Sequence, residues 1–189
     1  MPPTLNRHTL NVAGSVFLPW GFELSLNAAA ISKSPVNASV TSLYLPGTAP
    51  ASTNGSEPLP TLPLNCLGLT CGQSDLASAV TAFNSTYANG VARNAQGNLY
   101  KPITLPSNYS LGDGVITQDL ALHKTFAYKE RYKLLIIGQV FNAFNISNLS
   151  GYSFDLSTPT TFGQATGRAA QTFGSAGPRA FQVAARISF

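Results

Sequence analysis

Apolar and polar residues alternate along five segments of the chain. The clearest case is "RAFQVAARISF", 179–189, where Phe181, Val183, Ala185, Ile187 and Phe189 occupy every second position. Alternation with a period of two predicts β-strands with one apolar face. The predicted strands cover residues 9–17, 22–32, 114–126, 131–142 and 180–189.

The connections between these strands alternate in length. Strands one and two are joined at "LPWG", 18–21, and strands three and four at "AYKE", 127–130, whereas long segments cover 33–110 and 146–178. The long segments are rich in Pro, Ser, Thr, Asn and Gly, and only 74–87, capped by Ser74, is predicted to be helical. Antiparallel strands joined alternately by tight turns and long loops are typical of transmembrane β-barrels, whose periplasmic turns are short and extracellular loops long.

Two all-β architectures fit this alternation. In an antiparallel transmembrane barrel the apolar face meets lipid, and Glu23, Asp119 and His123 on the other face are expected to be solvated lumen side chains. A transport path lined by these three residues is the alternative. In a soluble, secreted β-sandwich, with a binding or adhesion role, the apolar face is buried against a second sheet. Five residues distinguish the two, because they face lipid in a barrel and are buried in a sandwich: Leu24, Leu26, Leu120, Leu134 and Ile136.

Composition and charge exclude several classes of function. Charged residues make up 10% of the chain, against about 25% in typical soluble domains, and the net charge of +4 is not clustered as in a nucleic-acid-binding protein. The apolar runs fall short of the roughly 20 residues of a membrane helix. His8 and His123 are isolated, so the sequence predicts no metal site, no cofactor and no catalytic grouping.

The two cysteines stand in "NCLGLTCG" as Cys66 and Cys71. Their spacing, with glycines and no histidine nearby, favours a small loop disulfide over a metal site, and such a disulfide would place the loop in an oxidising compartment. Two unpaired thiols in a cytosolic loop remain the alternative.

Aromatic residues are predicted near the ends of the strands, as in the girdles at membrane interfaces. Packing of aromatic side chains at hairpin ends is the alternative. The candidate girdle residues are Trp20, Tyr100, Tyr109, Phe126, Tyr128 and Tyr132.

Three stretches near the end of the chain carry a resemblance: "FNAFN" at 141–145, "FGQATGRAA" at 162–170 and "GPRAFQVAARISF" at 177–189. In order, they resemble the last part of TonB-dependent outer-membrane receptors, in particular the branch with a carboxypeptidase-regulatory-like N-terminal domain. The residues that match the family pattern are Asn142, Asn145, Phe162, Gly163, Pro178 and Arg179.

The resemblance implies a barrel of about 22 strands in the bacterial outer membrane, an internal plug, and uptake of a ligand driven by the TonB protein. The five predicted strands, without a plug, a TonB-contacting segment or a signal peptide, fall short of the roughly eight strands of the smallest closed barrels. We therefore expect residues 1–189 to be the C-terminal part of a single receptor barrel domain, and we expect this part to be inactive on its own. Its expected partners are outer-membrane lipid, the remainder of the barrel and plug, and TonB through the missing N-terminal part; nucleic acid is not expected.

The final strand resembles the aromatic-terminated strand that outer-membrane proteins present to their assembly machinery. The predicted signal consists of the alternating residues that end at Phe189. An ordinary edge strand at the end of a domain is the alternative. The ligand that the parent receptor would take up is not identified by these residues.

Overall fold

The structure is a computed structural model that describes residues 6–41, 43–44, 55–94, 96–129, 131–170 and 174–189. The chain forms two compact units. The sheet unit consists of His8–Ser32, Asp113–Ser150 and Gly167–Phe189, and the loop unit consists of Met1–Arg7, Lys33–Gly112 and Gly151–Thr166. Parts of the two expected long loops, 42, 45–54, 95 and 171–173, lie outside the described residues.

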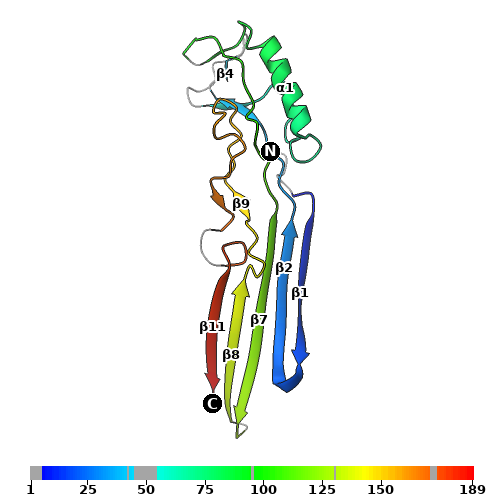
Figure 1. The fold of residues 1–189 in the computed structure, drawn as a ribbon, viewed down its shortest axis with the longest axis vertical. Helices are drawn as coiled ribbons and strands as arrows, with labels where there is room; N and C mark the ends of the chain where they lie inside the picture. Colours follow the sequence, from blue (N-terminus) through cyan, green and yellow to red (C-terminus); the bar gives the residue numbers. More distant parts are fainter. Residues whose placement is uncertain (1–5, 42, 45–54, 95, 130, 171–173) are drawn as a thin grey trace. The chain divides into compact units, whose positions relative to one another are not determined.

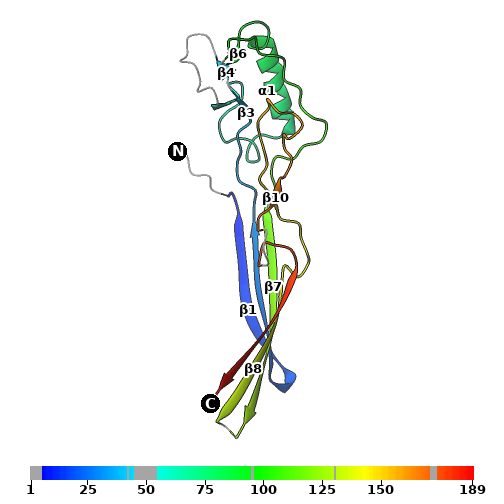
Figure 2. The same cartoon turned by 90° about the vertical axis from the view of Figure 1, so that its left-hand side faces the viewer.

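The sheet unit is built on five antiparallel strands in the order β1-β2-β7-β8-β11 (Figure 1). Their bounds lie within two residues of the predicted ranges: β1 Thr9–Leu18, β2 Phe22–Ile31, β7 Val115–Tyr128, β8 Tyr132–Phe141 and β11 Ala180–Ser188. The strands twist around one another (Figure 2), as the handedness of L-residues requires. The β1–β2 connection is a single 3-10 turn, Pro19–Gly21, in which Trp20 has a φ of 63°.

The register places most apolar residues of the five strands on one face, with exceptions such as Phe17, Leu135 and Ile137 on the face of Glu23 and His123. Residues directly opposite each other in an antiparallel pair share a face, and one such row runs through Leu24, Leu122, Gly138 and Val183. Exposed members of this apolar face include Leu10, Val12, Val16, Leu26, Leu122, Ile136, Phe181, Val183 and Ile187.

No second sheet covers this face within the described parts of the chain. Of the five residues that distinguish a barrel from a sandwich, Leu26 and Ile136 are exposed, and Leu24, Leu120 and Leu134 are only partly buried. The burial expected of a soluble sandwich is therefore not met. The sheet is open, and β1 and β11 are its two edges.

The segment 33–110 is far more ordered than its composition indicates. It contains helix α1, Gln73–Thr86, and two small antiparallel pairs: β3, Ser39–Thr41, with β5, Ser56–Pro58, and β4, Leu43–Tyr44, with β6, Arg93–Asn94. The sequence analysis predicted the helix but not the two strand pairs, because elements of two or three residues leave no periodic pattern in the sequence.

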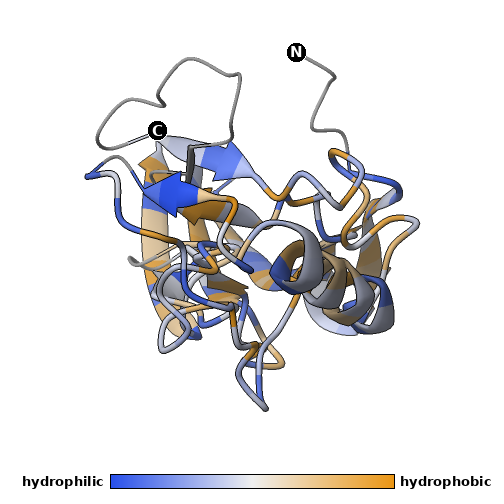
Figure 3. Ribbon diagram, turned by 90° about the horizontal axis from the view of Figure 1, so that it is seen from above, coloured by the Kyte–Doolittle hydropathy of each residue, from blue (hydrophilic) through white to orange (hydrophobic). Residues whose placement is uncertain are grey.

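A hydrophobic core holds the loop unit together. Its fully buried side chains include Val40, Leu59, Leu67, Leu76, Phe83 and Phe162. Helix α1 contributes its buried side, Leu76, Ala79, Val80 and Phe83, while polar residues elsewhere on the helix are visible in Figure 3. Core residues so far apart in sequence meet only in the folded chain, which is why the sequence pattern missed them.

The start of helix α1 differs from the prediction. Ser74 lies inside the helix, and the N-cap is Gly72, whose backbone N–H donates to Asp75 Oδ2 at 2.7 Å. Asp75 therefore satisfies one of the N–H groups at this end of the helix and also places a negative charge in its first turn.

The second long segment, 146–178, is also partly ordered. It contains β9, Leu149–Ser150, paired with β10, Gly167–Arg168, in the sheet unit, while Gly151–Thr166 belongs to the loop unit.

Candidate functional site

An asparagine cluster closes the end of β8 that follows Phe141. The Asn142 side chain is fully buried: its Nδ2 donates to the carbonyls of Ile146 (2.9 Å) and Gly177 (2.7 Å), and its Oδ1 accepts from Ile146 N–H (3.0 Å). Because Gly177 lies just before β11, Asn142 connects the end of β8 to the segment that leads into β11. This gives the first asparagine of the "FNAFN" stretch a structural role.

Two further asparagines complete this connection. Asn145 Oδ1 accepts from Arg179 N–H at 3.4 Å, immediately after Pro178 and before β11. Asn148, which is 1% exposed, pairs with the backbone of Ile116, with N–H to Oδ1 at 2.8 Å and Nδ2 to the carbonyl at 3.0 Å. Asn148 was missed by the sequence analysis, although its spacing of three from Asn145 repeats that of Asn142 and Asn145.

Asp119 belongs to the same cluster, and its predicted place as a solvated lumen side chain is wrong. It is 6% exposed, its Oδ1 accepts from Asn142 N–H at 2.9 Å, and its Oδ2 accepts a hydrogen bond from Ser175. Charge-assisted hydrogen bonds compensate a buried carboxylate for its lost hydration. Glu23 and His123 do lie on the polar face, directly opposite each other on β2 and β7.

Phe162 and Gly163 lie in the loop unit. Phe162 is fully buried and packs edge-on against Tyr109, with ring centroids 5.4 Å apart. Gly163 has a φ of 65°, and a Cβ there would lie 2.6 Å from Tyr109 Cβ and 2.7 Å from the Ser110 carbonyl. The close backbone approach therefore excludes other residues at this position.

The candidate aromatic girdle divides between the units. Trp20, Phe126, Tyr128 and Tyr132 are exposed beside the two short turns of the sheet. Tyr100 and Tyr109, by contrast, pack against the core of the loop unit, so their assignment to a girdle is wrong. Burial raises the pKa of the Tyr109 hydroxyl.

The strand predicted as an assembly signal is an edge of the sheet. β11 pairs with β8 on one side only among the described strands, and its apolar face carries four largely exposed side chains, Phe181, Val183, Ile187 and Phe189. Ser188 lies opposite Lys133, so Phe189 is at the end of the sheet where the short turns lie.

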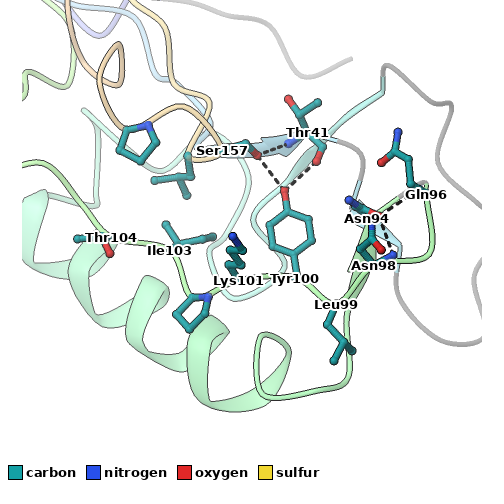
Figure 4. Close-up of a pocket in the computed structure, with 13 residues that line it drawn as sticks. Thr41, Asn94, Gln96, Asn98, Leu99, Tyr100, Lys101, Ile103, Thr104 and Ser157 are labelled. Carbon is teal, nitrogen blue, oxygen red and sulfur yellow. Dashed lines mark hydrogen bonds between the residues drawn. The ribbon is translucent and has the colours of Figure 1, made fainter.

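The loop unit contains a groove of about 630 Å³ that is lined by both polar and apolar side chains (Figure 4). Its walls carry amides and hydroxyls together with apolar patches from Leu99, Ile103 and Leu156. The backbone N–H groups of Gln96 and Asn98 donate to Asn94 Oδ1, at 3.1 and 2.9 Å, which fixes the turn that bears them. The side chains of Gln96 and Asn98 line the groove and offer amide groups to a ligand.

One wall of this groove is a hydrogen-bonded network around Tyr100. The Tyr100 hydroxyl donates to the Thr41 carbonyl at 2.8 Å and lies 2.9 Å from Ser157 Oγ, which accepts from Thr41 N–H (Figure 4). Burial raises the pKa of Tyr100, and the charge of Asp155 adds to this rise against the lowering effect of the Ser157 hydrogen bond. Tyr100 is thus a neutral, rigid part of the wall.

Asp155 accepts hydrogen bonds from two residues of the same wall, Thr41 and Ser157. Burial acts to raise the pKa of Asp155, but hydrogen bonds from Thr41, Ser157 and Thr158 together outweigh that effect and lower it. The carboxylate therefore stays ionised in the folded state at lower pH than in the unfolded chain.

The structure joins Cys66 and Cys71 by a disulfide within the loop unit. Neither is near a cluster of metal ligands: in the described parts of the chain, no group of three or more His, Cys, Asp or Glu side chains is placed to hold a metal ion.

The Asn142 connection generates a first prediction. Asn142→Asp removes both Nδ2 donors, leaves two carbonyls unsatisfied and brings a second carboxylate close to Asp119. We expect a loss of about 2–4 kcal/mol in the free energy of unfolding, measured by urea titration in detergent micelles. Asn11→Asp, which adds the same charge at an exposed position of the polar face, is the control; equal losses in the two variants would contradict the role of Asn142.

A second prediction concerns acid sensitivity of the loop unit. Because the folded-state pKa of Asp155 lies below its ordinary value of 3.8, its stabilising contribution is present above that value and is lost as the pH falls through the folded-state pKa. Asp155→Asn should therefore flatten the pH dependence of stability in this acidic range, followed by circular dichroism of helix α1. Glu57→Gln, at an exposed position of β5, is the control; unchanged acid sensitivity of the Asp155→Asn variant would refute the assignment.

Comparison with known proteins identifies the family. A model of the outer membrane beta barrel domain matches residues 8–182. No curated protein and no solved structure matches the chain. None of the described helices has the length and apolar character needed to cross a membrane. The matched range includes the strands of the sheet up to Gln182. Proteins of this family lie in the bacterial outer membrane, which accounts for an apolar face that no described segment of the chain covers. The chain belongs to the outer membrane beta barrel domain family and is a protein of the bacterial outer membrane.

Proposed function

We propose that the chain forms part of the barrel of a TonB-dependent receptor, which takes up a ligand across the outer membrane with energy transmitted by TonB. The observation that carries the proposal is the open sheet with an apolar face. Backbone groups at the free edges of β1 and β11 have no water to bind in lipid, so both edges require further strands. The proposed partners are the rest of the barrel, its plug, TonB and the outer-membrane assembly machinery.

The ordered series of matching residues supports the finer family assignment. Asn142 and Asn145 connect β8 to the segment of Pro178 and Arg179 that opens β11. The same residues that carry the resemblance therefore build one physical connection between the last two strands. A role in transport, without catalysis, fits this architecture.

The groove of the loop unit is the proposed ligand-contacting part. Its amide and hydroxyl side chains, with Lys101 as a cation and Leu99 as an apolar contact, suit a hydrogen-bonding ligand without a net positive charge. The long connections of barrels are extracellular, so the loop unit would be accessible to a ligand from outside the cell.

Dependence on TonB tests the proposed transport. In a bacterium that produces this protein, deletion of its gene and deletion of the gene for TonB should leave the same compound in the growth medium, measured by mass spectrometry of spent medium. Restoring the gene should restore uptake. If the compound left behind by the first deletion is still consumed by cells without TonB, the proposal is wrong.

The groove has its own prediction. Asn98→Ala removes an amide from the groove lining and should weaken uptake of that compound about fivefold, as expected for the loss of one hydrogen bond. Ser85→Ala, on helix α1 and outside the groove lining, is the control. Full uptake by the Asn98→Ala variant would remove the groove from the ligand path while leaving the TonB dependence intact.

A further inference from the structure

Lys124 is an exception on the apolar face of the sheet. The register places it directly opposite Phe22 on β2 and Ile136 on β8. Along the strands of the described sheet it is the one charged residue on this face, whose other members are apolar apart from Gln118, a buried residue. A lysine on a lipid-facing surface is strongly destabilising at the bilayer midplane and far less so near its interfaces, so the depth and the surroundings of Lys124 need an explanation.

The surroundings of Lys124 are aromatic. Its Nζ lies 4.6 Å from the centroid of the Phe22 ring and 5.5 Å from that of Phe126. These contacts stabilise the cation at the level of the exposed aromatic residues beside the short turns, which is the level of a membrane interface. Lys124 thus lies at a depth where lipid headgroups are found.

No carboxylate neutralises this cation within the described part of the chain. Glu23 is the acidic residue nearest to it in the register, but Glu23 follows Phe22 in β2 and therefore points to the polar face. Leu122 and Phe126 flank Lys124 on the same strand and the same face. Gly21 of the β1–β2 turn lies close to the ammonium group, since a Cβ added to Gly21 would be 3.5 Å from Lys124 Nζ. The ammonium group is left with aromatic rings and open space.

An apolar groove of about 270 Å³ lies on the same face beside this cation. It is lined by Leu18, Pro19, Trp20, Phe22 and Leu122. Phe22 belongs both to the groove and to the Lys124 contact, so the cation stands at the border of the groove. A cation at the border of an apolar groove, at interface depth, is complementary to an anionic group attached to a hydrocarbon chain.

We propose that this groove and Lys124 bind one anionic phospholipid. The phosphate pairs with Lys124 Nζ, and the first part of an acyl chain lies along Trp20, Phe22 and Leu122. Lysine snorkelling to water would satisfy the ammonium group as well, but it would give no preference among lipids. The inference rests on the membrane location of the sheet and not on TonB-dependent uptake.

The single tryptophan of the chain provides the test, because Trp20 lines the groove. The 189-residue chain is refolded in detergent micelles that contain bromine-labelled phosphatidylglycerol or, in parallel, bromine-labelled phosphatidylcholine. Quenching of Trp20 fluorescence measures which lipid occupies the groove. We expect phosphatidylglycerol to be preferred about fivefold, the size expected for one lysine at an anionic surface.

Three variants distinguish a specific lipid-binding site at Lys124 from a general attraction of the positively charged chain to negatively charged lipid. Lys124→Gln should bring the preference to unity, and Lys124→Arg should retain it. Lys133→Gln lowers the net charge equally, but Lys133 lies on the polar face opposite Ala127 and Ser188, so this variant should keep the preference. Equal quenching by both lipids in the unmodified chain, or equal loss of preference in the Lys124→Gln and Lys133→Gln variants, would overturn the proposal.

Discussion

Strand register is the constraint on which the rest of this structure depends. Side chains alternate between the two faces of a strand, so a slip of one residue in any pair would move every apolar side chain of that strand to the polar face. Rows such as Leu24, Leu122, Gly138 and Val183 form only in the observed register. In lipid the penalty for a slip is high, because the polar face would then meet hydrocarbon.

The asparagine cluster explains how the register of the last strands is held. Two short turns fix the β1–β2 and β7–β8 pairs, but the connection from β8 to β11 is long and cannot fix a register by its length. Asn142 and Asn145 replace such a turn, since they bind the backbone just before and at Arg179. Asn148 adds two hydrogen bonds, which join its side chain to the backbone N–H and carbonyl of Ile116 on β7. The cost of leaving these buried polar groups unpaired makes the connection specific.

The two units are stabilised by different means. The loop unit has a buried core around Phe83 and Phe162, with a short disulfide-closed turn at Cys66 and Cys71, and so follows the rules of a water-soluble domain. The sheet unit has almost no buried hydrophobic residues, because its apolar surface is directed outward. The groove of the loop unit consequently faces water, whereas the Lys124 cation faces the membrane interface.

The sequence by itself determined the five strands, their faces and their antiparallel order, because period-two alternation and short turns act over a few neighbouring residues. It also singled out Asn142, Asn145, Phe162 and Gly163 through a resemblance, but gave no physical reason for them. Only the tertiary structure showed that Asp119 is buried, that Tyr100 and Tyr109 pack in a core, and that 33–110 folds. Each of those outcomes depends on contacts between residues far apart in the chain, and local patterns carry no information about such contacts.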